Sequence, residues 1–449
     1  MTGAMTRKEQ LEDGRSRRNR VSRASHGDWQ PAKDRPDPVA LLMADNEGRV
    51  EDLVPIRFGR MAANPFAFLR GSAGVMAADL AAMPHTGLDA QLCGDCHLMN
   101  FGLFATPERN VVFGLNDFDE TVQGPWEWDL KRLAASFVVA SQDVRLPDKK
   151  AVEIAIAAVR SYRTRIQKLA TMSPLEVWYD RIDLARAIED STDSAMKKRR
   201  QQIDRQARRR VAENLYPKLI TNDGGTRRIA DQPPLIYHPE GVSTETVVDF
   251  LATYRSSLPK DRRVLFDRYT IEDAAIKVVG VGSVGTLCFI ALFSDDDGHP
   301  LLLQVKEANK SALAPYVAKR KGKTHNGERV VVGQHLMQPA SDIFLGWGTG
   351  KNGREFYVRQ LRDMKLSVTL SGDVLELTRY AEFCGIALAR AHANTGSAAA
   401  ISAYLGTSDK FDEALGQFGL AYARQTVRDH AALVDAIESG RVPAIFETL

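Results

Sequence analysis

A glycine motif between two β-rich runs constrains the fold of this chain more than any other feature of its sequence. The motif Gly-Val-Gly-Ser-Val-Gly occupies residues 280–285, and we name it the glycine loop. Dinucleotide-binding loops of the same spacing open a helix, because the pyrophosphate lies at the N-terminus of that helix. Residues 286–293 are instead rich in β-branched and aromatic side chains, which predict a strand. The glycine loop is therefore expected to connect two strands.

A lysine follows the glycine loop at the position that a kinase-like nucleotide site requires. In protein kinases a glycine loop between two strands covers the phosphates of ATP, and a lysine on the third strand reaches them. Residues 301–306 are a third β-rich run, and Lys306 ends it. The residues expected to contact the nucleotide are Gly280, Gly282, Ser283, Gly285 and Lys306. The alternative is an ordinary glycine-rich hairpin with a surface lysine.

A kinase-like site also needs a carboxylate on the next helix to hold the lysine. The sequence pattern predicts that helix at residues 327–337, and Glu328 lies at its start. Glu307 competes for the same role, but adjacent residues of a strand point to opposite faces. We therefore predict an ion pair between Lys306 and Glu328.

A second group of polar residues lies far from the glycine loop in the chain, at residues 93–100, which we name the Asp95 loop. Asp95 and Asn100 have the Asp-x-x-x-x-Asn spacing of a kinase catalytic loop. The aspartate of that loop orients or deprotonates the acceptor hydroxyl. We expect Asp95 to act as this base and Asn100 to be a ligand of Mg²⁺.

The remaining metal ligands are expected after a predicted β-hairpin. Two short apolar runs, residues 100–104 and 111–115, flank a turn-forming stretch and predict this hairpin. Asp117 and Phe118 follow it, where kinases carry the metal-binding Asp-Phe-Gly, and Asp119 replaces the glycine. Because Mg²⁺ prefers oxygen ligands, we expect Asp117 and Asp119 to complete its site.

The cysteines of the Asp95 loop allow a different interpretation. Cys93 and Cys96, with His97 next to them, have the spacing of half a zinc site or of a redox pair. The other two cysteines of the chain are solitary, so a structural zinc site would lack its second pair. His97 is either a hydrogen-bond partner in the loop or a buried structural residue. Asp129, which opens a predicted helix, either caps that helix or braces the loop.

The order of these segments differs from that of a kinase. A kinase chain carries the glycine loop, the lysine and the glutamate first, and its base and metal ligands later. Here residues 93–120 precede residues 276–361. Residues 385–392 are typical of the helix that leads into a kinase catalytic loop, although an ordinary alanine-rich core helix has a similar pattern. Joining the chain after His392 to Gln91 would restore the kinase order. The arrangement predicts a circular permutation, which proteins tolerate where the old termini lie close together at the surface.

We therefore expect an α+β, protein-kinase-like fold of two lobes, circularly permuted, with a small antiparallel β lobe and a large helical lobe. The expected parts are a disordered basic tail (1–37), a helical lobe with both catalytic segments (38–268), a β-rich nucleotide-binding lobe (269–365) and closing helices (366–449).

Sixty Lys and Arg nearly balance 57 Asp and Glu, which argues against a nucleic-acid partner. Four cysteines, no secretory signal and no apolar run near the roughly 20 residues of a membrane span predict a cytoplasmic protein without a membrane partner.

Six motifs in order resemble the bacterial domain of unknown function 2252 family. They are residues 64–71, 94–102, 116–120, 280–286, 304–308 and 358–365. The Asp95 loop is also similar to the His-Gly-Asp-x-His-x-x-Asn motif of aminoglycoside phosphotransferases and choline kinases, with Cys93 in place of the first histidine. The resemblance implies Asp95 as the base, Asn100 and Asp117 as metal ligands, and Lys306 on the phosphates.

These observations predict an ATP- and Mg²⁺-dependent phosphotransferase that acts on the hydroxyl of a small molecule. The acceptor class follows from the character of the Asp95 loop and from the lack of the Ala-Pro-Glu sequence that ends a protein-kinase activation segment. A nucleotidyl transferase that uses the same site is one alternative, and a non-catalytic nucleotide-binding pseudokinase is another. The motif of residues 64–71 has no kinase counterpart, so its Arg70 is assigned either to packing or to contact with a substrate.

Overall fold

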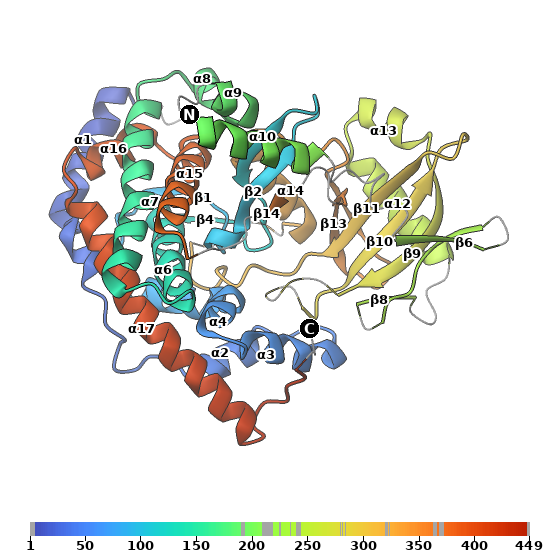
Figure 1. Ribbon diagram of the computed structural model, residues 1–449, viewed down its shortest axis with the longest axis horizontal. Helices are drawn as coiled ribbons and strands as arrows, with labels where there is room; N and C mark the ends of the chain where they lie inside the picture. Colours follow the sequence, from blue (N-terminus) through green and yellow to red (C-terminus); the bar gives the residue numbers. More distant parts are fainter. Residues whose placement is uncertain are drawn as a thin grey trace.

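A helical region and a sheet region lie side by side in the structure (Figure 1). The computed structural model describes residues 5–189, 194–208, 219–223, 226–233, 235–238, 244–278, 280, 282, 284–318, 322, 324–361, 366–367 and 372–446, and all structural statements concern these residues. Every described pair of strands is antiparallel. The α+β class and the antiparallel sheets are confirmed.

The N-terminal segment, which we expected to be a disordered tail at 1–37, contains a helix that packs on the helical region. This helix is α1 (Arg7–Arg20), and it contacts α16 (Ala398–Leu405). The contact is close, since a Cβ on Gly14 would lie 2.1 Å from the carbonyl oxygen of Ala400. The polar sequence concealed this helix because its packing depends on a glycine rather than on an apolar stripe.

Four short helices follow, at the start of the predicted helical lobe (38–268). They are α2 (Pro38–Ala44), α3 (Val54–Met61), α4 (Pro65–Gly71) and α5 (Ala73–Ala81). The Asn64 side chain caps α4 by accepting a hydrogen bond from Ala67 N at 2.7 Å. Phe58 of α3 shares a small apolar core with Leu433 of α17 (Lys410–Glu438).

Long helices make the main core of the helical region. They are α6 (Glu127–Asp143), α7 (Asp148–Leu169), α15 (Val374–Ala393), α16 and α17. α15 and α7 approach closely, because a Cβ on Gly385 would lie 2.1 Å from the carbonyl oxygen of Ala158. Trp126 stacks on Tyr162 within this core, with 5.5 Å between the ring centroids. The predicted helical character of the C-terminal part is confirmed.

Two small sheets within the helical region carry the Asp95 loop and the segment that follows it. The first pairs β1 with β4, and the second has the order β14-β2-β3-β5. Their bounds are β1 (Asp89–Leu92), β2 (Phe101–Ala105), β3 (Val111–Leu115), β4 (Val122–Pro125), β5 (Ile182–Asp183) and β14 (Leu366–Ser367). The pairing of β2 with β3 confirms the predicted hairpin.

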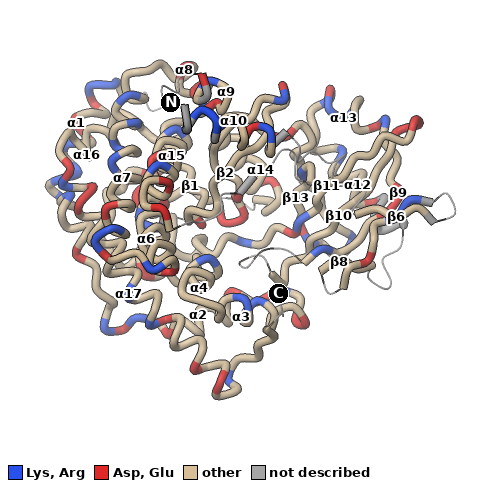
Figure 2. Tube along the Cα trace, viewed as in Figure 1, with Lys and Arg blue, Asp and Glu red and all other residues tan. Residues whose placement is uncertain are grey.

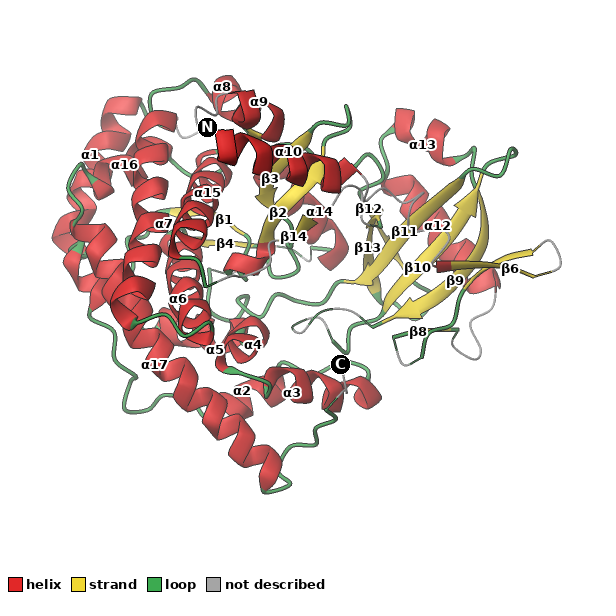
Figure 3. Cartoon of the chain, viewed as in Figure 1, coloured by secondary structure: helices red, strands yellow, loops and turns green. Residues whose placement is uncertain are grey.

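The sheet region is built on six strands in the order β12-β13-β11-β10-β9-β8 (Figure 3). Their bounds are β8 (Ile236–Tyr237), β9 (Thr270–Lys277), β10 (Cys288–Ser294), β11 (Pro300–Glu307), β12 (Gly346–Thr349) and β13 (Glu355–Gln360). The strands expected on both sides of the glycine loop and at Lys306 are confirmed. β12 was not predicted, because Gly346 and Gly348 weaken its strand pattern.

Three helices complete the sheet region. They are α12 (Thr244–Ser257), α13 (Lys260–Phe266) and α14 (Asn326–Met337). Tyr254 of α12 and Phe266 of α13 share an apolar core with Phe293 of the sheet. The expected lower boundary of this lobe, residue 269, is therefore too late in the chain. The predicted helix at 327–337 is confirmed as α14, which contacts β13 as well as β1 of the helical region.

The remaining described elements are short or peripheral. They are the 3-10 helices η1 (Ala24–Gly27), η2 (Glu51–Leu53) and η3 (Leu98–Asn100), and α8 (Pro174–Tyr179), α9 (Leu184–Glu189), α10 (Ser194–Arg208), β6 (Ile220–Asp223) and β7 (Thr226–Ile229). Among the described helices, none has both the length and the apolar character needed to cross a membrane. Figure 2 shows basic and acidic segments mixed in both regions.

Candidate functional site

One cleft collects most of the residues that the sequence singled out. It has a volume of about 700 Å³ and lies between the glycine loop and the helical region. The predicted site residues that line it are Gly280, Gly282, Asp95, Asn100, Asp117 and Asp119. Ser283 lies outside the described residues. Two segments that are far apart in the sequence therefore meet at one place.

The glycine loop lies close against residues 49–50 of the helical region and against the end of α4. Arg49 donates from Nη1 to the carbonyl oxygen of Val284 at 2.7 Å. The carbonyl oxygen of Gly285 accepts a backbone N–H from the same segment at 2.8 Å. Gly285 has a φ of +90°, a conformation that favours glycine. A Cβ on Gly282 would lie 3.1 Å from the carbonyl oxygen of Arg70, so small residues permit the approach.

Lys306 reaches from the sheet region to the helical region. Its side chain is 3% exposed, and its ammonium group pairs with Oδ2 of Asp119. The other oxygen of Asp119 accepts a hydrogen bond from the Tyr357 hydroxyl at 2.7 Å. Burial lowers the pKa of Lys306, but attraction to Asp119, Tyr357 and Asp117 together outweighs burial, so that the pKa is raised and the pair is charged at neutral pH. Both oxygens of Asp119, a predicted Mg²⁺ ligand, are thus engaged by Lys306 and Tyr357.

The predicted pair between Lys306 and Glu328 is corrected by the structure, because the partner of the lysine is Asp119. Glu328 instead lies in the first turn of α14, where its backbone N donates to His325 Nδ1 at 3.2 Å. The next residue, Arg329, connects α14 to the helical region by donating to the carbonyl oxygen of Asp119 at 2.8 Å. Because side chains of adjacent helix residues point about 100° apart, a shift of one residue decides which side chain faces the helical region. The sequence pattern did not indicate whether Glu328 or Arg329 would do so.

Asp95 is held by a buried arginine. Arg132, which is 2% exposed, donates from Nε to Asp95 Oδ1 at 2.7 Å. The Asp95 side chain remains 20% exposed, and His97 Nε2 lies 3.5 Å from its second oxygen. Burial raises the pKa of Asp95, and attraction to Arg132 only partly opposes this rise. Burial also holds the pKa of His97 well below its usual value, so His97 is a neutral, buried neighbour of Asp95.

Asn100 and Asp117 present oxygen atoms to the same cleft. Asn100 donates from Nδ2 to the carbonyl oxygen of Asp95 at 2.7 Å, which leaves its Oδ1 as the atom that can bind a metal. Asn116 N donates to the carbonyl oxygen of Asn100 at 2.9 Å and ties the two segments together. Asp117 accepts a hydrogen bond from Asp119 N at 3.2 Å, and its carboxylate keeps further acceptor capacity. These are the hard oxygen donors that Mg²⁺ prefers.

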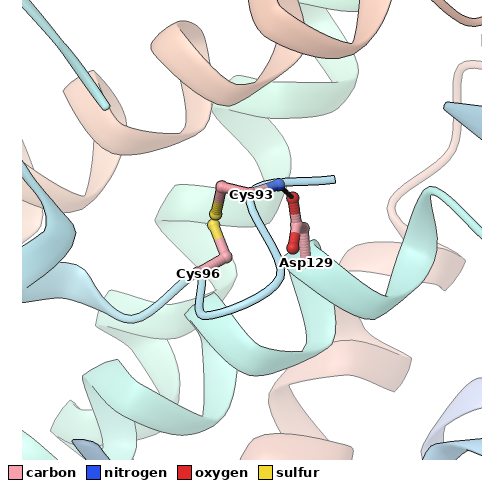
Figure 4. A group of neighbouring side chains, drawn as sticks. All are labelled: Cys93, Cys96 and Asp129. Carbon is pink, nitrogen blue, oxygen red and sulfur yellow. Dashed lines mark hydrogen bonds between the residues drawn. The ribbon is translucent and has the colours of Figure 1, made fainter. Parts of the chain in front are cut away.

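Asp129 braces the Asp95 loop from α6 (Figure 4). Its Oδ2 accepts a hydrogen bond from Cys93 N at 2.8 Å, and its Oδ1 accepts one from Gly94 N at 3.1 Å. His392 Nε2 lies 3.3 Å from the same carboxylate. Of the two roles considered for Asp129, the structure therefore supports the brace.

The two thiols of the Asp95 loop are buried beside this brace. Cys93 and Cys96 are free, and their sulfur atoms and a carboxylate oxygen of Asp129 lie within 4.8 Å of one another. Burial raises the pKa of both thiols, to about 11 for Cys96, so both are neutral at pH 7. Because both Asp129 oxygens already accept backbone hydrogen bonds from the Asp95 loop, we interpret Cys93, Cys96 and Asp129 as a structural support of that loop.

The C-terminal end of α15 lies next to the start of the Asp95 loop. Gln91 N donates to Thr395 Oγ1 at 2.9 Å, although 304 residues separate them in the sequence. His392, one turn earlier, contacts the brace and also lies 2.9 Å from the Tyr162 hydroxyl through Nδ1. The chain segments that follow His392 and that begin at Gln91 are therefore neighbours in space.

Buried and half-buried arginines organise the cleft, and only Arg70 among them was singled out from the sequence. Arg49 and Arg57 line the cleft from the segment between α2 and α4, and burial lowers the pKa of Arg57 to about 9. Arginine is usually exposed, so its burial is not expected from residue type alone. One signal was present for Arg132, which interrupts the apolar pattern of α6.

One of three comparisons with known proteins confirms the resemblance of the six motifs to a bacterial family. No curated protein and no solved structure matches the chain. The family described as "Uncharacterized protein conserved in bacteria (DUF2252)" matches residues 49–436, a range that includes the glycine loop, the Asp95 loop and every arginine of the cleft wall. The chain therefore belongs to the DUF2252 family.

Proposed function

We propose that this protein is an ATP- and Mg²⁺-dependent phosphotransferase whose kinase-like site is assembled in circularly permuted order. The observation that carries the proposal is the contact between Lys306 and Asp119 beside a cleft that the glycine loop, Asp95 and Asp117 also line. A site for phosphoryl transfer needs a loop over the phosphates, a cation, a base and metal ligands close together. Residues suited to the loop, the base and the metal ligands line the cleft, and the cation, Lys306, lies beside it in contact with the lining residue Asp119.

In this proposal the nucleotide phosphates lie under the glycine loop and contact Lys306. The register of the sheet fixes the lysine, which lies opposite Cys288 of β10 and Tyr357 of β13. Its ammonium group stays charged at neutral pH because Asp119 pairs with it. A rigid, charged lysine next to a cleft is suited to binding phosphate oxygens.

Asn100 and Asp117 are the residues that would hold Mg²⁺. The Asn100 side chain is oriented by its hydrogen bond to the Asp95 carbonyl, and the Asp117 carboxylate lines the cleft without an ion pair among the described residues. When bound, Mg²⁺ supplies positive charge that neutralises the phosphate oxygens during transfer. Asp119 contributes to this site indirectly, by holding Lys306.

Asp95 is the proposed acceptor of the proton from the substrate hydroxyl. Its raised pKa makes it a stronger base than an exposed aspartate, and Arg132 fixes the orientation of its carboxylate. A cleft of about 700 Å³ that also admits the nucleotide favours a small acceptor molecule.

The permuted order is supported by the neighbours of the Asp95 loop. In a kinase the chain runs from the helix of Leu-Ala-x-x-His character directly into the catalytic loop. Here the corresponding residues at the end of α15 meet the Asp95 loop through Gln91 and Asp129 instead of through a peptide bond. The rest of the fold can then keep a kinase-like arrangement despite the different chain order.

Labelled ATP tests the proposal directly. The purified protein is incubated with Mg²⁺, a small-molecule extract, and ATP labelled at either the γ or the α phosphate. We expect Mg²⁺-dependent transfer of the γ label to a small molecule, and transfer about 10²- to 10⁴-fold slower with Asp95→Asn. Transfer of the α label would identify a nucleotidyl transferase, and nucleotide binding without transfer would identify a pseudokinase. A protein that binds no nucleotide would overturn the proposal.

A further inference from the structure

Arg70 is the charged residue that the 64–71 motif contributes to the cleft, and the proposed phosphotransferase mechanism gives it no role. It lies in the last turn of α4 and lines the cleft. Its Nε is buried and has no hydrogen-bond partner among the described residues. Burial lowers the pKa of Arg70, and the carboxylates of Asp95 and Asp117 attract the guanidinium and partly offset that cost.

The backbone on both sides of Arg70 is fixed by other buried arginines. Arg132 donates from Nη2 to the carbonyl oxygen of Leu69 at 2.7 Å, and the same guanidinium holds Asp95. Arg57 donates from Nη2 to the carbonyl oxygen of Gly71 at 2.7 Å. The position of Arg70 relative to Asp95 is therefore set in advance, as expected for a residue that binds a ligand.

The charges around the cleft also single out Arg70. Asp95 already has Arg132 as its ion-pair partner, and Asp119 has Lys306. The half-buried guanidinium of Arg70 has no ion pair among the described residues, and its attraction to Asp95 and Asp117 only partly offsets the cost of its burial, so a bound anion would stabilise it. A guanidinium presents parallel N–H groups that match phosphate and carboxylate groups.

We propose that Arg70 binds an oxyanion, a phosphate or a carboxylate group, beside Asp95 and Asp117 in this cleft. The oxyanion has two possible sources, the γ-phosphate of the nucleotide or an anionic group of the acceptor. Assigning it to one of these sources rests on the proposed function. The existence of an oxyanion site at Arg70 does not, because inorganic phosphate alone can probe it.

The test compares the wild-type protein with Arg70→Gln and Arg70→Lys by calorimetric titration. The matched control is Arg424→Gln, which removes an arginine that is 64% exposed and lies in α17. The probes are Mg·ADP, a non-hydrolysable Mg·ATP analogue, inorganic phosphate alone, and inorganic phosphate added to the protein saturated with the ATP analogue. Loss of a charge-assisted hydrogen bond is expected to weaken oxyanion binding by about 10- to 100-fold in Arg70→Gln, and by less in Arg70→Lys.

Each outcome either identifies the source of the oxyanion at Arg70 or shows that Arg70 binds none. If Arg70→Gln loses the preference for the ATP analogue over ADP, the oxyanion is the γ-phosphate. If that preference stays and phosphate no longer binds to the saturated complex, the oxyanion belongs to the acceptor. If no protein binds nucleotide but Arg70→Gln loses binding of phosphate alone, the proposed function fails and the oxyanion site stands. Binding equal to that of Arg424→Gln with every probe would overturn the site.

The melting temperature separates a ligand-binding Arg70 from a structural one. Because the Arg70 side chain has no ion pair among the described residues, its replacement by glutamine breaks no existing bridge. We expect Arg70→Gln without ligand to melt at or above the wild-type temperature. A clear drop in the melting temperature, with oxyanion binding unchanged, would assign Arg70 to packing and contradict the proposal.

Discussion

The two regions of the molecule hold their site residues by different means. In the sheet region, Lys306 is placed by hydrogen bonds to neighbouring strands, and the glycine loop connects two adjacent strands of the same sheet. In the helical region, Asp95 and the backbone around Arg70 are held by Arg132, which reaches across from α6. Local register is visible in a sequence, whereas contacts between distant elements are not. The difference also implies that substitutions in the two regions will have different consequences.

The largest effect is expected at Asp95, where a substitution should lower turnover without changing nucleotide binding. Asp95→Asn removes the proposed base but keeps the size of the side chain, so turnover should fall by about 10²- to 10⁴-fold. Nucleotide-induced stabilisation should stay close to the wild-type value, because Asp95 is not among the residues proposed to bind the phosphates or Mg²⁺. Kinetic assays together with thermal melting check both expectations. Unchanged turnover would remove Asp95 from the mechanism.

Arg132 tests whether long-range arginines support the helical region. Arg132→Met leaves the Asp95 carboxylate and the Leu69 carbonyl oxygen without their donor, so the free energy of unfolding should fall by about 3 kcal/mol. Urea unfolding measures this loss, with Arg424→Gln as a surface control expected within about 0.5 kcal/mol of wild type. If both variants unfold alike, Arg132 is not a support and the contrast between the regions is wrong.

The pair that joins the regions should lose strength in acid. Burial raises the folded-state pKa of Asp119, but attraction to Lys306 and the hydrogen bonds from Lys306 and Tyr357 together lower it below its ordinary value. The contribution of Asp119 to stability is therefore complete above about pH 4 and is lost as the pH falls through the folded-state pKa. Wild type and Asp119→Asn should therefore differ by about 1–2 kcal/mol in unfolding free energy at pH 7. Urea titrations from pH 7 to pH 3 should show this difference shrinking only at the acid end. A difference that instead grows in acid would contradict the charged pair.

The smallest effect is expected at Glu328. Because Lys306 pairs with Asp119, Glu328→Gln should leave nucleotide affinity and turnover within about twofold of wild type. Asp119→Asn is the matched comparison, since it removes the same charge at the observed partner. A loss in Glu328→Gln as large as that in Asp119→Asn would return Glu328 to the role that the sequence suggested.

Features that depend on a few consecutive residues were predicted well. β9, β10 and β11, the β2–β3 hairpin and α14 follow from alternation, turn residues and apolar spacing within short windows. The convergence of Asp95, Asn100 and Asp117 with the glycine loop was expected from two motifs that are each incomplete alone. Motifs that share one chemical task therefore indicate which distant segments meet in the fold, whereas local patterns indicate only secondary structure.

Features that depend on distant contacts were missed. The partner of Lys306 lies 187 residues earlier in the chain, and no spacing rule connects the two. α1 is ordered through Gly14 against α16, and β12 carries glycines where α12 packs on it. In each case a long-range contact overrides a weak local preference, which a single sequence does not reveal.

The central claim is that Lys306 and Asp117, from different regions, act on one bound nucleotide. A double-mutant cycle with Lys306→Met and Asp117→Asn, measured as the free energy of Mg·ATP binding by calorimetry, tests it directly. Each single variant should bind more weakly, and the double variant should lose less than the sum of the two losses, with a coupling free energy of about 1 kcal/mol or more. Losses that add within about 0.5 kcal/mol, or binding that neither substitution changes, would contradict the claim.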